Sequence, residues 1–71
     1  MNKIELLDTV ALTVDRPDHG LVTGQVGTVV ETLAQGMFEV EFCDDQGRAY
    51  ASLAVPATQL ITLRFSPAQA A

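Results

Sequence analysis

The sequence is poor in positive charge, and this shortage argues against whole classes of partner. Only four of its 71 residues are Lys or Arg, against nine Asp or Glu, which gives a formal net charge of −5 at pH 7. A nucleic-acid-binding protein draws most of its non-specific affinity from Lys and Arg side chains that neutralise phosphates. The excess of acid therefore argues against nucleic acid and anionic membranes, and favours a basic protein as partner.

Cysteine and long apolar runs are also scarce. Cys43 is the single cysteine, so no internal disulfide can form, and a reducing, cytoplasmic location is expected. No apolar run approaches the roughly 20 residues of a membrane span. The first residues, MNKIELLD, lack the basic, apolar and small-residue regions of a secretory signal. We therefore expect no membrane association.

A chain of 71 residues allows one domain at most. Its hydrophobic fraction of 48% is typical of a packed globular domain and not of a disordered chain. The last residues, SPAQAA, offer nothing to bury. We therefore predict a single domain over residues 1–65 and a flexible C-terminal tail over residues 66–71.

Alternation of apolar and polar residues predicts strands. The clearest is MFEVEFC at 37–43, in which Phe38, Val40 and Phe42 face inward while Glu39 and Glu41 face outward. Weaker patterns predict four more strands, at 9–14, 26–33, 48–55 and 60–65. In the first of these, the inward residues are Val10, Leu12 and Val14. Between the strands we expect a long loop at 15–25, turns at 34–36 and 44–47, and one helical turn at 56–59.

Side-chain size suggests how the hairpin after residue 37 is paired. Placing Cys43 opposite Arg48 sets large inner residues against small ones, as a tight core requires. The predicted inner pairs are Phe42 with Ala49, Val40 with Ala51 and Phe38 with Leu53. The predicted outer pairs are Glu41 with Tyr50 and Glu39 with Ser52.

Glycines mark the stretch GLVTGQVGTVVETL at 20–33. Gly20 and Gly24 suit positive φ angles in the long loop, and Gly47 suits the end of a turn. Gly27 lies inside a strand, where a bulge, a sharp bend or a close approach of another backbone would favour glycine. In the loop between the first two glycines, Leu21 and Val22 are expected to fold inward over one end of the core.

The order of these segments resembles an SH3-like barrel, and the segment GQVGTVVE is similar to the glycine-centred element of the KOW motif. The resemblance implies an all-β, five-stranded SH3-like barrel with one short 3-10 turn before the last strand. The whole chain also resembles a family of small bacterial proteins of unknown function. That likeness is carried by LDTVAL at 7–12, HGLVTGQVGTVVE at 19–31, EVEFCDDQGRAYA at 39–51 and Leu60. It implies no established activity. It does imply a protein that is encoded beside another small protein, as in toxin–antitoxin or immunity pairs.

No set of catalytic or metal-binding residues is evident. His19 has Asp18 beside it but no candidate nucleophile, and an exposed loop histidine is the simpler interpretation. Cys43 precedes Asp44 and Asp45, which should raise the pKa of the thiol and make it less reactive. One cysteine and one histidine cannot build a standard zinc site, and the acids lack calcium-loop spacing. We therefore expect no enzyme, no cofactor and no metal.

The preferred hypothesis is a non-enzymatic protein-interaction module, such as an antitoxin-like, immunity-like or accessory subunit. Its predicted partner-binding residues are Glu39, Glu41 and Tyr50 on an acidic outer face, which Glu31 extends, and Arg16 in the long loop. The competing interpretation is an acidic strand face that is merely solvated. The alternative function is a KOW-like RNA- or ribosome-associated domain. The sequence leaves open a monomer or a homodimer, the identity of the partner, and whether the loop or the face binds it.

Overall fold

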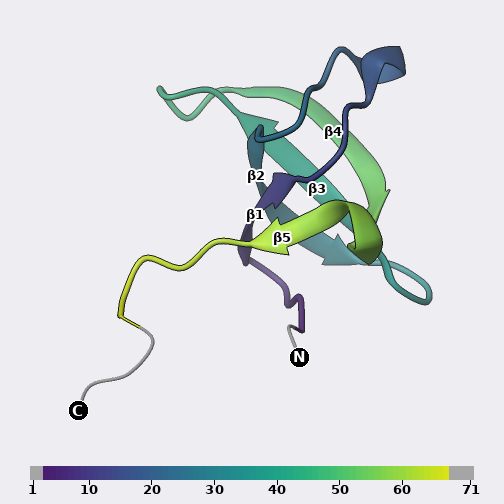
Figure 1. Ribbon diagram of the computed structural model, residues 1–71, viewed down its shortest axis with the longest axis vertical. Helices are drawn as coiled ribbons and strands as arrows, with labels where there is room; N and C mark the ends of the chain where they lie inside the picture. Colours follow the sequence, from purple (N-terminus) through teal and green to yellow (C-terminus); the bar gives the residue numbers. More distant parts are fainter. Residues whose placement is uncertain (1–2, 68–71) are drawn as a thin grey trace.

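The computed structural model describes residues 3–67 and consists of one antiparallel five-stranded sheet (Figure 1). Neighbouring strands follow the order β4-β3-β2-β1-β5. The predicted all-β class is therefore confirmed, as is the single 3-10 turn before the last strand. The elements are β1 (Thr9–Leu12), the 3-10 turn η1 (Pro17–His19), β2 (Val26–Thr32), β3 (Met37–Cys43), β4 (Ala49–Pro56), the 3-10 turn η2 (Ala57–Gln59) and β5 (Leu60–Thr62).

The sheet is strongly bent but open, with β4 and β5 as its two edges (Figure 1). Closure into a barrel is not shown, and it stays a prediction. The predicted flexible tail lies mainly outside the described residues, which end at 67. Within the described part of the chain, no helix is long and apolar enough to span a membrane.

The core lies on the concave face of the sheet and follows the alternation of β3, whose Phe38, Val40 and Phe42 are buried. Leu21 reaches the core from the long loop, as predicted. Val22 does not, since 57% of it is exposed. Its amide donates to Gln25 Oε1 over 2.6 Å in a surface turn, which holds the side chain away from the core. The remaining core residues are Val10, Leu12, Val29, Leu53, Val55 and Leu60.

The first strand is shorter than predicted, because β1 ends at Leu12. Beyond it the chain is held by loop contacts: the Thr13 amide donates to the Gln59 carbonyl over 2.9 Å. Val14 is consequently 36% exposed and does not join the core. The alternating pattern continued past the strand, whereas the backbone pairing did not.

The predicted β3–β4 register is wrong by two residues. Cys43 lies opposite Ala49, so the turn is one residue longer than predicted, and the Asp44 amide donates to the Arg48 carbonyl over 2.8 Å. A bulge then leaves Tyr50 without a partner and shifts the register once more. Beyond the bulge the shift is two residues, which keeps the paired side chains there on their predicted faces, whereas Ala49, before the bulge, lies opposite Cys43 and is exposed instead of facing inward. The observed pairs are Phe42 with Ala51, Glu41 with Ser52, Val40 with Leu53, Glu39 with Ala54 and Phe38 with Val55.

The bulge in β2 is not at Gly27, where it was predicted, but at Val30. Val29 pairs with Val40 and Glu31 with Glu39, which leaves Val30 as the extra residue. Gly27 instead lies where the backbone of β3 approaches closely, which was the other predicted reason for a glycine. A Cβ atom there would lie 2.8 Å from the carbonyl oxygen of Glu41. The predicted positive φ angles are confirmed at Gly20 and Gly24, and Gly47, which was predicted to end a turn, also has a positive φ angle.

Candidate functional site

Three carboxylates share the outer face of β2 and β3. Glu31 lies directly opposite Glu39, and Glu41 follows two residues along β3 on the same side of the sheet. We call these three residues the acidic face. Ser52 Oγ donates a hydrogen bond of 2.8 Å to Glu39 Oε2. Arg16 and His19 form ion pairs with Asp18 in the long loop and not with the acidic face.

The bulge moves Tyr50 away from the position predicted for it. Ser52, rather than Tyr50, lies opposite Glu41. The Tyr50 phenol oxygen instead accepts a hydrogen bond of 2.9 Å from Gln25 Nε2 in the long loop, and the side chain remains 48% exposed. Tyr50 therefore joins the start of β4 to the loop. Its part in partner binding stays a prediction.

Arg16 is engaged within the molecule. Its Nη1 donates to Gln59 Oε1 over 3.1 Å, and its Nε lies 3.9 Å from Asp18 Oδ1. The backbone of Arg16 forms an isolated bridge with Leu21. Arg16 thus ties the long loop to η2, a link across 43 residues of sequence that no local pattern could indicate. Whether it also contacts a partner stays a prediction.

The carboxylate of Asp15 joins the two ends of the long loop. Asp15 Oδ1 accepts hydrogen bonds from the amide and the hydroxyl of Thr23, over 2.8 and 2.9 Å. These bonds favour the charged carboxylate, so they lower the pKa of Asp15. The bond from the Thr23 amide has the larger effect, and the bond from the Thr23 hydroxyl has the smaller one. The loop is therefore an ordered element at neutral pH, stabilised by an ionised side chain.

Cys43 and His19 lie in different places and share no reactive arrangement. Partial burial raises the pKa of the Cys43 thiol, and the nearby Glu41 and Asp44 carboxylates raise it further. A thiol with a raised pKa is a poor nucleophile. His19 Nε2 lies 3.4 Å from Asp18 Oδ2 in the loop. Among residues 3–67, no group of three or more His, Cys, Asp or Glu could hold a metal ion.

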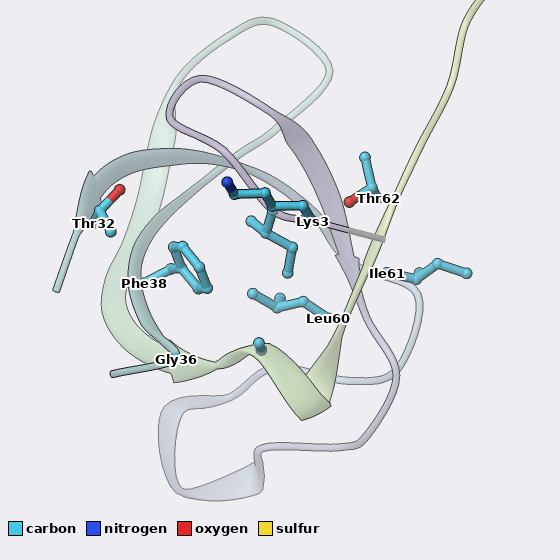
Figure 2. A pocket seen from close by; sticks show the side chains of 9 residues that line it. Lys3, Thr32, Gly36, Phe38, Leu60, Ile61 and Thr62 are labelled. Atoms are coloured by element: carbon cyan, nitrogen blue, oxygen red, sulfur yellow. The ribbon is translucent and has the colours of Figure 1, made fainter. Parts of the chain in front are cut away.

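A pocket of about 450 Å³, which no sequence pattern predicted, opens at one end of the sheet (Figure 2). Phe38 and Leu60 point into it, whereas Ile61 points away. Thr62 Oγ1 is buried at the pocket without a hydrogen-bond partner. The pocket forms where the N-terminal segment, the ends of β2 and β3 and the strand β5 meet, so no contiguous motif encodes it. Its lining residues are Lys3, Ile4, Thr32, Gly36, Phe38, Ala57, Leu60, Ile61 and Thr62.

The chain belongs to the family described as a domain of unknown function, DUF4926, whose family model matches residues 6–62. No curated protein and no solved structure matches the chain significantly. The predicted membership in a family of unknown function is thereby confirmed. The family description names no activity, substrate or partner.

Proposed function

Within this family of unknown function, we propose that the chain is a non-enzymatic interaction module that binds a basic protein through its acidic face. The observation that carries the proposal is the direct opposition of Glu31 and Glu39 beside Glu41. Like charges placed directly opposite each other on a sheet destabilise it. A bound Lys or Arg would relieve this repulsion, so binding would gain charge complementarity at the acidic face.

The proposal extends to setting and fold. We propose a cytoplasmic antitoxin-like, immunity-like or accessory subunit, in line with its single cysteine and its net charge of −5. We also propose an SH3-like barrel. This is supported by the five strands, their order, the strong bend of the sheet and the 3-10 turn before the last strand.

A KOW-like, RNA- or ribosome-associated domain is the second candidate. It is favoured by the segment GQVGTVVE, which runs into β2 and contains the close approach at Gly27. The scarcity of Lys and Arg counts against it, since RNA affinity rests largely on phosphate contacts.

The test is an affinity capture from the native cell lysate at low salt, followed by mass spectrometry and RNA analysis. The variant Glu39→Lys/Glu41→Lys reverses the acidic face. The matched control, Glu5→Lys/Asp45→Lys, makes the same change in net charge at exposed positions elsewhere. We expect one basic protein in a fixed ratio, retained by the control and lost by the face variant. Equal retention by both variants would remove the acidic face from the proposal, and salt-sensitive RNA retention would favour the second candidate.

A further inference from the structure

Strand β4 is an edge of the sheet: it pairs with β3 on one side, and no other described strand pairs with its second side. Its eight residues, AYASLAVP, include no charged side chain. Among the described residues, its backbone forms no hydrogen bond outside the ladder with β3. About half of the peptide groups of an edge strand point away from the sheet. The opposite edge, β5, is only three residues long, so β4 presents the longer row of free donors and acceptors.

Proteins usually protect such edges with charges, prolines or bulges. In β4 these protections are confined to the ends, where Tyr50 forms the bulge and Pro56 closes the strand. Residues 51–55 lie between these two ends and include no charge, proline or bulge. This middle stretch is therefore open to pairing with another extended chain.

The outward side chains of this stretch are small, and the acidic face lies behind them. Ser52 is opposite Glu41, and Ala54 is opposite Glu39. A strand added to β4 would lie about 4.8 Å from it and about 10 Å from β3. Long Lys and Arg side chains of the added strand could extend over the small residues, with their apolar stems on the sheet and their charges at the two carboxylates.

We propose that β4 is a docking edge for an extended segment of a partner protein that carries Lys or Arg at alternate positions. Backbone hydrogen bonds to residues 51–55 supply affinity, and contacts with Glu39 and Glu41 supply specificity. A second copy of this chain fits poorly, because its four basic residues, Lys3, Arg16, Arg48 and Arg64, are isolated in the sequence. The inference rests on the proposed function and adds the conformation of the bound partner segment.

The test uses the full ¹⁵N-labelled chain and a capped ten-residue peptide of alternating lysine and threonine. Binding is followed by amide chemical shifts, and strand addition by protection of the amides of residues 51–55 from hydrogen exchange. Three control peptides are used. One keeps the composition but groups the lysines in a block, and the other two keep the alternating order but carry N-methyl groups on either the lysines or the threonines. We expect at least tenfold weaker binding of the block peptide and of one member of the N-methylated pair.

Two protein variants complete the experiment. Ala54→Lys places a charge on the docking edge beside Glu39, and we expect at least a tenfold loss of affinity. Ser66→Lys makes the same charge change beyond β5 and should bind within twofold of the original chain. Equal losses in both variants would reduce the effect to net charge and overturn the proposal.

The outcomes separate the two proposals. Binding that needs Glu39 and Glu41 but protects no amide of residues 51–55 would overturn the docking edge and leave the acidic face intact. Protection that an alternating glutamate–threonine peptide produces equally well would overturn the basic segment. Protection that rises with protein concentration, without peptide, would assign the edge to a second copy and also overturn the proposal. Absence of binding at millimolar peptide would contradict both.

Discussion

Replacing Gly27 by alanine should destabilise the sheet, although a single methyl group is added. The new Cβ would lie 2.7 Å from Val40 Cγ1, 2.8 Å from the Glu41 carbonyl oxygen and 3.0 Å from Phe42 Cδ1. A side chain can move by rotation, whereas the Glu41 carbonyl is backbone within β3 and can move only with its strand. The strands must therefore separate locally, at a position where Gly27 is paired with Phe42.

The size of the effect follows from two opposed contributions. Overpacking a well-filled site costs about 1–3 kcal/mol. Replacing glycine also restricts the unfolded chain, which stabilises by about 0.4–1 kcal/mol where the backbone allows it. The net loss in the free energy of unfolding is then roughly 1–2 kcal/mol. For a domain of this size it corresponds to a fall in Tm of about 4–16 °C. Gly27→Val should be worse, because its γ carbons add further contacts.

Urea denaturation followed by far-ultraviolet circular dichroism measures this loss. The matched control is Gly20→Asn, at a position where a Cβ meets nothing within 4 Å. Its φ of 70° is one that asparagine tolerates better than most residues, so the control should lose less than about 1 kcal/mol. If Gly27→Ala unfolds at the same urea concentration as the original chain, the close approach does not explain this glycine.

Three further predictions concern the core and the long loop. Phe42→Ala empties a fully buried site and should cost about 3–5 kcal/mol, enough to unfold much of so small a domain; a urea midpoint close to the original would contradict the assigned core. Tyr50→Phe removes the acceptor for Gln25 at an exposed site, and should change stability by less than about 1 kcal/mol, while faster amide exchange in residues 22–25 would report the lost loop contact. Because folding lowers the pKa of Asp15, the hydrogen bonds from Thr23 stabilise the fold fully at pH values above the ordinary pKa of 3.8. This stabilisation is lost as the pH falls below 3.8 and through the lowered pKa of the folded protein. Asp15→Asn should therefore be less stable than the original at pH 7, with a difference that shrinks below about pH 3.8; a difference independent of pH would refute this role.

Alternation was enough to predict β3 and its buried face. The bounds of MFEVEFC match the strand, because the buried Phe38, Val40 and Phe42 alternate with Glu39 and Glu41. Alternation failed where the backbone departs from regular pairing. It carried the first strand on to Val14, and it gave no indication of the bulge at Tyr50 or of the longer turn before Ala49. A bulge changes pairing without changing composition, so a single sequence holds little sign of it.

The candidate site shows the same division between predictable and unpredictable features. The outward positions of Glu39 and Glu41 follow from period two and are predictable. The proximity of Tyr50 to Gln25, of Arg16 to Gln59, and of the pocket's lining residues depends on contacts between distant segments. Local patterns do not encode such contacts, because they arise only once the sheet is bent.

The bulge at Val30 links the irregular sequence of β2 to the acidic face. If the ladder continued regularly past the Val29–Val40 pair, Val30 would lie opposite Glu39, and Glu31 would lie opposite Phe38 on the buried side. The extra residue places Thr32 opposite Phe38 at the pocket and moves Glu31 to the outer face beside Glu39. Like charges facing each other at the surface cost about 1 kcal/mol or less. The remaining surface repulsion is small enough for the fold to tolerate, and it is the repulsion that a basic partner would remove.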